Sequence, residues 1–199
     1  MNKLTYLEKL LLKRKVTRSY KKSSFDKNKL ANIAKYSIKI PTAGFSRGIE
    51  IIQINDSNKI NEIAYIFNEK SFNKDKKLPW ISNSISLFFI ILNEEAYHKR
   101  YLSPDKTKSV NSKNWDVPYW YVDSGAAVMN CMLLIEEAGL SSGFMGLHNI
   151  KRELIHNLLN IPDELKIIGL ISAGESSGDK IQKKFYKKMK LVHYETYSK

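Results

Sequence analysis

The chain has 199 residues and a mass of 23.0 kDa; 43% of its residues are hydrophobic, 27% are charged, and its formal net charge is +13. This length predicts a single domain over residues 1–199 that buries about 70% of its extended surface, and the composition excludes a disordered chain, a collagen and a disulfide scaffold. One cysteine, Cys131, excludes an intrachain disulfide and a multi-cysteine metal cluster, and suits a reducing compartment.

Helices and strands alternate in the first half of the chain. Leucines at helical spacing predict a helix within residues 1–13. A second helix is predicted over 26–39, capped by Ser23 or Ser24 and ended before Pro41. The elements that follow are a loop of small residues (41–48, PTAGFSRG), a β-branched strand (49–55), a short helix (59–68) and an apolar, buried strand (84–93).

The second half is organised around one apolar helix. Residues 94–122 are rich in aromatic residues and interrupted by prolines, so we expect a short helix followed by a long ordered loop. Asp123 is a good N-cap for a helix over 123–138 that is apolar almost all round and stops at Gly139, so this helix is expected to be central. The elements that follow are a short strand or turn (142–147), an amphipathic helix (151–160), a buried strand (165–173) and a basic polar tail.

Together these elements predict one α+β domain with helices at both ends and a mixed sheet, without repeats or internal linkers. The first twenty residues carry charges throughout, which excludes a secretory apolar segment there. The longest apolar run, residues 85–92, is too short to span a bilayer. We therefore expect a soluble, cytoplasmic protein that has no membrane partner.

The positive charge is almost all lysine, with 28 lysines and 5 arginines. Base reading and bidentate phosphate contacts favour arginine, so the composition favours a solvated basic surface over a nucleic-acid interface. A second use of such charge is to bind a small phosphorylated cofactor. The sequence lacks the common phosphate-loop, dinucleotide, zinc-protease and serine-hydrolase motifs, and its four histidines lack metal-ligand spacing. Cys131 lies among apolar residues and is expected to be a buried, inert thiol.

Four segments remain as candidates for a binding site. Arg14, Lys15 and Arg18 are three cations within five residues, where the first helix ends, and such a cluster can hold a phosphate. The loop 41–48 permits close approach of its backbone to a flat ligand. The other two segments are 141–146 (SSGFMG), directly after the central helix, and a late basic cluster of Lys183, Lys184, Lys187 and Lys188.

The order of these motifs is more informative than any one of them. A basic motif is followed by a P-S/T-A-G loop, a D-x-G-A-A helix, the sequence G-L-S-S-G-F-M-G, a strand that ends in A-G, and basic residues before V-H-Y-E. This ordered set resembles the FMN-dependent nitroreductase superfamily over nearly the whole chain. The stretch WDVPYWYVDSGAAVMN is similar to a subgroup whose loop reads A-P-S-A-G-F-S/T-Q-G.

The resemblance implies a nitroreductase-like α+β fold, in which helices flank a mixed, mainly antiparallel sheet, and a homodimer with an FMN on each side of the dimer interface. It implies an enzyme in which NADH or NADPH reduces the flavin and a small planar acceptor, such as a nitroaromatic compound or a quinone, reoxidises it. Because the flavin carries the hydride chemistry, no catalytic acid–base pair is expected. The nearly all-apolar central helix separately favours an obligate dimer.

The resemblance also assigns cofactor-binding residues. The phosphate and ribityl chain are assigned to Arg14, Lys15, Val16 and Arg18, and to a late basic residue, Lys187 or Lys188. The loop beside the flavin ring consists of Pro41, Thr42, Ala43, Gly44 and Phe45. Backbone donors near the reactive nitrogen of the flavin are assigned to Gly143, Phe144, Met145 and Gly146.

This site contains a loop that differs from the family pattern, and a group of aromatic residues that has two interpretations. Phe45-Ser46-Arg47 replaces the commoner Asn-x-Gln, and Arg47 is predicted either beside the flavin or in solvent. The aromatic residues Trp115, Tyr119 and Trp120 either cover a planar substrate or form interface core. Two other functions stay open: a flavin-binding protein with specialised chemistry, such as dehalogenation or flavin destruction, and a basic nucleic-acid-binding module.

Overall fold

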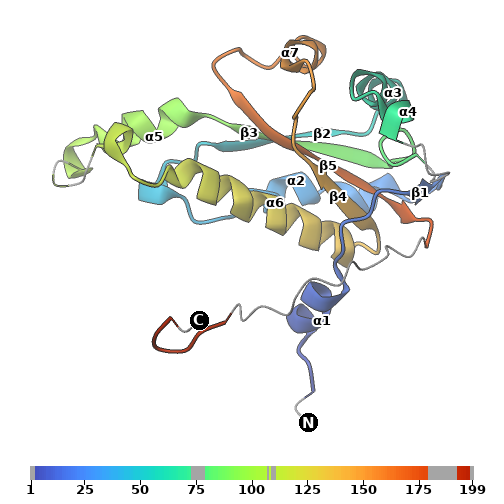
Figure 1. Cartoon of the computed structure of the whole chain (residues 1–199), viewed down its shortest axis with the longest axis horizontal. Coiled ribbons are helices and arrows are strands. Elements are labelled where there is room, and N and C mark those ends of the chain that lie inside the picture. The colour runs from blue at the N-terminus through green and yellow to red at the C-terminus, as the bar shows by residue number, and fades with distance from the viewer. Residues whose placement is uncertain (1–2, 73–78, 107, 109–110, 179–191, 198–199) are drawn as a thin grey trace.

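The centre of the molecule is an antiparallel β-sheet (Figure 1). The structure is a computed structural model that describes residues 3–72, 79–106, 108, 111–178 and 192–197. Within these residues the strands are β1 (Tyr20–Lys21), β2 (Ile49–Ile54), β3 (Ser86–Leu92), β4 (Ser141–Met145) and β5 (Lys166–Ser176). Their order is β1-β5-β3-β2, and β4 also pairs with β5. An isolated parallel bridge joins Val16 to Ser142.

The apolar strand β3 is buried on both faces because helices cover both sides of the sheet. Its side chains alternate between two hydrophobic clusters. Leu87, Phe89 and Ile91 belong to one cluster, and Phe88, Ile90 and Leu92 to the other. The continuous apolar run of the sequence thus has the burial that was predicted for it.

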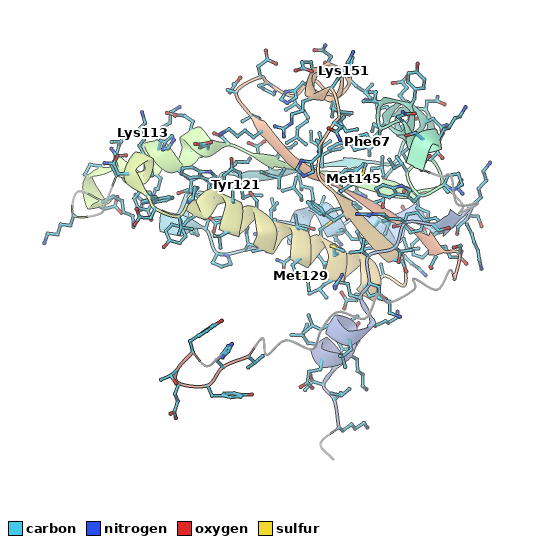
Figure 2. All side chains as sticks on the ribbon, viewed as in Figure 1. Phe67, Lys113, Tyr121, Met129, Met145 and Lys151 are labelled. Atoms are coloured by element: carbon cyan, nitrogen blue, oxygen red, sulfur yellow. The ribbon has the colours of Figure 1, made fainter. Side chains whose placement is uncertain are left out.

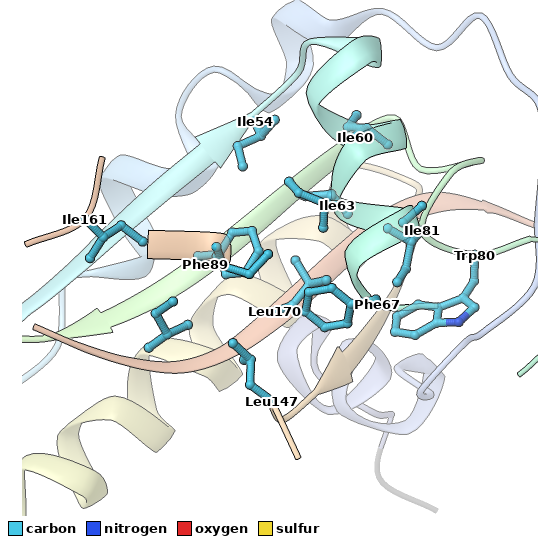
Figure 3. Close-up of a cluster of buried hydrophobic side chains, with 14 of the residues drawn as sticks. Ile54, Ile60, Ile63, Phe67, Trp80, Ile81, Phe89, Leu147, Ile161 and Leu170 are labelled. Carbon is cyan, nitrogen blue, oxygen red and sulfur yellow. The ribbon is translucent and has the colours of Figure 1, made fainter. Parts of the chain in front are cut away.

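The first cluster lies under α3 (Ser57–Ile66) and α7 (Arg152–Leu159) (Figure 3). Ile60 and Ile63 of α3 and Ile155 of α7 pack onto the sheet there. Asp56 begins α3 by accepting a hydrogen bond from the backbone of Lys59 at 2.8 Å. Met145 of β4 also packs against this cluster.

The second cluster lies under α6 (Tyr119–Glu137) and α2 (Ile33–Ser37). α6 crosses this face, as Figure 1 shows, and α1 (Tyr6–Lys13) lies beside its C-terminal end. Cys131 of α6 is fully buried, and burial raises the pKa of its thiol to about 12. The predicted burial of the thiol and the predicted helix against the core are both confirmed.

The remaining described elements are short. The helices are α4 (Glu69–Phe72) and α5 (Glu94–Tyr101), and the 3₁₀ turns are η1 (Lys27–Leu30), η2 (Ala43–Phe45), η3 (Pro104–Lys106) and η4 (Ser112–Asn114). The predicted helix over 26–39 is wrong as a single element, because it is divided into η1 and α2. Asn28 and Asn32, which are weak helix formers, fall within the divided region, and Asp26 instead of a serine caps η1.

Two boundaries also correct the sequence prediction. α6 begins at Tyr119, directly after Pro118, so Asp123 lies inside the helix and is not its N-cap. β5 extends to Ser176, because its end pairs with β1, a two-residue strand that carries too little pattern to predict. No helix in the described part of the chain is long and apolar enough to cross a membrane.

Candidate functional site

The basic segment after α1 lies against β4. The backbone N–H of Thr17 donates to the carbonyl of Ser142 at 2.8 Å, and the guanidinium of Arg18 donates to the carbonyl of Phe144 at 3.1 Å. Two segments that the sequence singled out, more than 120 residues apart, therefore form one unit. We call residues 14–18 with 142–146 the cationic half-site.

The contact between the two segments is close because β4 has a glycine there. A Cβ atom on Gly143 would lie 2.3 Å from the carbonyl oxygen of Thr17, and real side chains do not approach backbone so closely. The hydroxyl of Tyr20, a fully buried residue, bonds the same carbonyl at 3.1 Å. Gly143 is thus required for packing rather than for a special backbone angle.

The cationic half-site contains polar atoms that the protein does not satisfy. Among the described residues, three buried side-chain atoms lack a hydrogen-bond partner: Nε of Arg14 and Oγ of Ser142 in this half-site, and Nε1 of Trp120 in α6. Buried polar groups normally have partners, so the two atoms in this half-site, which lie beside Lys15 and Arg18, are suited to a polar ligand. Lys15 and Arg18 are exposed beside them, and the guanidinium of Arg18 also lies 5.8 Å from the ring centre of Trp80. This donor set fits a phosphate.

The loop 41–48 is held at the other end of α6. One carboxylate oxygen of Asp123, a buried residue of α6, accepts hydrogen bonds from the backbone of Ala43 at 2.9 Å and from the hydroxyl of Tyr97 at 2.8 Å. Arg100 of α5 donates from Nε to the carbonyl of Gly44 at 2.7 Å. Burial raises the pKa of Tyr97, and so do its hydrogen bond to Asp123 and the charge of that carboxylate. We call residues 41–48 with these partners the loop half-site.

The loop itself adopts an unusual backbone. Gly44, Phe45 and Arg47 have φ angles of 60°, 62° and 55°, in the left-handed region that residues other than glycine rarely adopt. The guanidinium of Arg47 lies 4.1 Å from the ring centre of Phe45, and both side chains are exposed. Pro41 is also exposed, whereas Thr42 is half-buried and accepts the backbone N–H of Arg47 at 3.1 Å. The loop thus presents an aromatic ring and a cation to solvent.

An aromatic cluster adjoins this loop. The ring of Trp115 packs edge-on against Tyr101 and Tyr119, at centroid distances of 4.7 and 5.3 Å, and stacks on Trp120 at 5.6 Å. Tyr119 is exposed and Trp115 half-buried, but Trp120 is 7% exposed and packs within the core. Tyr119 and Trp120 belong to α6, which begins before the point where the sequence predicted the loop to end. Of the three aromatic residues predicted to contact the substrate, Tyr119 is the most exposed.

The two half-sites lie apart within one protomer. Asp123 holds the loop near the start of α6, whereas Glu136 pairs with Lys13 of α1 at 3.0 Å near its end. These two positions are thirteen residues apart, or about 20 Å along the helix. In Figure 2, Tyr121 marks the region of the loop half-site and Met145 that of the cationic half-site.

Sequence reasoning missed residues of the loop half-site. Tyr97 and Arg100 carried no motif, and the role of Asp123 was assigned wrongly, because a buried tertiary contact leaves no local pattern. In the cationic half-site the segment 141–146 was singled out, but Ser142 itself was given no role. The position of Asp123 next to an apolar run was the available signal, since a buried carboxylate needs partners. The predicted late contact, Lys187 or Lys188, lies outside the described residues. Within the described part of the chain, no group of three metal-ligating side chains was found.

Comparison with solved structures shows a shared fold. An FMN-dependent nitroreductase from Clostridium difficile is 23% identical, with a TM-score of 0.67 over 94% of this chain and 98% of that chain. A putative NADH dehydrogenase/NAD(P)H nitroreductase from Bacteroides thetaiotaomicron is 18% identical, with a TM-score of 0.68 over 98% and 100%. Nitroreductase A from Vibrio parahaemolyticus is 17% identical, with a TM-score of 0.70 over 99% and 79%.

The sequence also matches a known protein family. Residues 11–175 match the Nitroreductase family, although no curated protein gives a match. The match spans both half-sites, and with the shared fold it confirms the predicted α+β class and an oxidoreductase function. Because most of its length matches, the chain belongs to the nitroreductase family.

Proposed function

We propose that the protein is a dimeric, FMN-dependent oxidoreductase that takes electrons from NADH or NADPH and passes them to a small planar acceptor. The observation that carries this proposal is the pair of unsatisfied buried atoms, Nε of Arg14 and Oγ of Ser142, beside two further cations, Lys15 and Arg18. Family membership makes FMN the ligand to which these groups are suited. The C. difficile neighbour, which has the same fold, is itself described as FMN-dependent.

The cationic half-site would hold the phosphate end of the cofactor. Arg14, Lys15 and Arg18 supply positive charge for a group that carries close to two negative charges. Arg18 is already oriented by the carbonyl of Phe144 and by the ring of Trp80, so little side-chain freedom is lost on binding. The backbone of Gly143–Gly146 would lie along the flavin. When bound, FMN supplies the hydride chemistry.

An exposed apolar surface supports the dimer. α1 has no buried residue, and its side chains Leu7 and Leu12 are 56% and 69% exposed. On α6, Val122 is 56% exposed and continues into a half-buried stripe at Ala126, Met129 and Leu133. Apolar exposure of this extent along two neighbouring helices is typical of an interface between copies.

Each flavin site would then take residues from both protomers. The loop half-site is held at the start of α6, whereas α1, which leads into the cationic half-site, is paired with its end, so the two half-sites of one protomer lie apart. In a two-fold dimer, the loop of the partner can complete the site. Phe45 and Arg47, which face solvent in one protomer, would in the dimer face the cofactor and the path of the nicotinamide.

The acceptor site would be lined by exposed rings. Tyr119 and the half-buried Trp115 lie beside the loop half-site, where their faces are suited to stack on a planar compound such as a nitroaromatic or a quinone. The buried ring of Trp120 supports Trp115 from behind. Because the flavin carries the reaction, no acid–base pair is required of these residues.

The absorption spectrum of the purified protein tests this proposal. We expect a visible flavin band that is bleached under anaerobic conditions by NADH or NADPH and restored by a quinone, in a particle of twice 23.0 kDa. A colourless protein that does not take up added FMN, and that binds heparin with steep salt dependence, would refute it in favour of nucleic-acid binding. A yellow particle of 23.0 kDa would refute the shared site.

A further inference from the structure

The loop half-site is fixed from the α6 side by one buried carboxylate. A single oxygen of Asp123 accepts from the backbone of Ala43 and from the hydroxyl of Tyr97, which is itself fully buried. A buried carboxylate is unfavourable unless such donors satisfy it. Both donors come from other elements, η2 and α5, so the carboxylate does not stabilise its own helix. It joins three separate segments.

The same loop is held from the α5 side. Nε of Arg100 donates to the carbonyl of Gly44, while the other nitrogens of this guanidinium are occupied by Asp105, each at 2.7 Å. The ring of Tyr101 fills the space where a side chain on Gly44 would lie, since a Cβ atom there would be 2.5 Å from the ring. α5 thus fixes both the direction of the Gly44 peptide and its distance from the helix.

These contacts stabilise a loop whose backbone conformation is strained at Phe45 and Arg47. Phe45 and Arg47 adopt left-handed φ angles, and Phe45 is 66% exposed, so burial of its own ring does not hold it in place. Strained backbone persists where the surroundings determine it. Here the surroundings are Ala43 and Gly44, the two residues directly before Phe45, and both are tied by their backbone to side chains of α5 and α6.

We propose that Asp123 is a positioning residue for the flavin site, acting with Tyr97 and Arg100 to hold Phe45 and Arg47 in the orientation that the cofactor requires. All three act through the loop, and we assign none of them a contact with the ligand. The inference rests on the proposed function, in which this loop completes a flavin site of the partner protomer. Asp123 would therefore act on the cofactor bound by the opposite protomer.

The test compares substitutions on one helix. Asp123→Ala removes the accepting oxygen, and Ser124→Ala is its matched control, because Ser124 is also buried but bonds the carbonyl of Trp120 in its own helix. We expect Asp123→Ala to raise the FMN dissociation constant at least about tenfold and to change the visible circular dichroism of bound flavin. Ser124→Ala should leave both unchanged at temperatures where the protein is folded.

Two further variants keep the test informative if Asp123→Ala does not fold. Tyr97→Phe removes one donor, and Arg100→Ala removes the contact with Gly44 from a partly exposed position. Both should weaken FMN binding and alter the flavin dichroism in the same direction. The positioning role is overturned if all folded variants bind FMN as the wild type does and differ only in thermal stability. A wild type that binds no FMN overturns the proposed function, and this inference with it.

Discussion

Substitution of Gly143 by alanine should separate the two segments of the cationic half-site. The new Cβ would lie 2.3 Å from the carbonyl oxygen of Thr17 and 3.1 Å from Oγ of Ser172, so backbone rather than a flexible side chain must move. Overpacking of this kind costs about 1–3 kcal/mol. Weakening of the bond from Thr17 to the carbonyl of Ser142 adds about 1 kcal/mol. We expect the free energy of unfolding to fall by about 2–4 kcal/mol.

Denaturant unfolding at fixed protomer concentration measures this change, and fluorescence titration of the apo-protein measures FMN affinity. FMN should bind at least about tenfold more weakly to the folded variant. The reason is that the new Cβ moves Arg18 away from its position beside the β4 backbone. Gly125→Ala is the matched control: a Cβ there meets nothing within 4 Å in the protomer, and alanine favours the helix by about 1 kcal/mol. Wild-type stability and affinity in Gly143→Ala would refute the packing argument.

Four other changes test separate parts of the structure. Arg14→Ala and Arg18→Ala should each weaken FMN binding by about 1.5–3 kcal/mol through loss of a charged hydrogen bond, and unchanged titrations in both would reject the phosphate assignment. Arg47→Ala should lower kcat or raise the nicotinamide KM at full flavin content, whereas wild-type kinetics would leave it a surface residue. Leu12→Glu, which charges an apolar position that is 69% exposed, should shift the sedimenting species from dimer to monomer. Cys131, whose buried thiol has a pKa of about 12, should not react with thiol reagents at neutral pH until the protein unfolds, and rapid labelling of native protein would contradict its burial.

Periodicity and apolar runs predicted the elements that bury their own side chains. The strand around β3 and the helix α7 are found where the pattern placed them, because burial on two faces or on one stripe leaves a direct trace in the sequence. β1 was missed because it depends on pairing with β5, and α2 was overextended because the weak helix formers Asn28 and Asn32 fall within the region where the predicted helix is divided. The family and the fold class were confirmed, since ordered motifs over the whole chain carry more information than any one element.

The candidate site was predictable in its segments but not in its geometry. The order of motifs identified the cations at 14–18 and the strand after the central helix, and the structure brings them together. Nothing in the sequence indicated that the loop 41–48 lies at the other end of α6. Asp123 was predicted as a helix cap from its position before an apolar run, whereas three-dimensional packing gives it two partners from other elements. Local rules cannot assign such a residue.

The placement of one half-site at each end of α6 has a consequence for mixtures of defective chains. In the proposed dimer, a chain damaged at Arg18 and a chain damaged at Gly44 each form inactive homodimers. A hybrid of the two contains one site with both defects and one site with none, because each site takes its halves from different chains. Random mixing of equal amounts should therefore restore about a quarter of the intact flavin sites, as in complementation between two alleles. Recovery of colour on mixing would reveal a cofactor shared between copies without any structure of the complex.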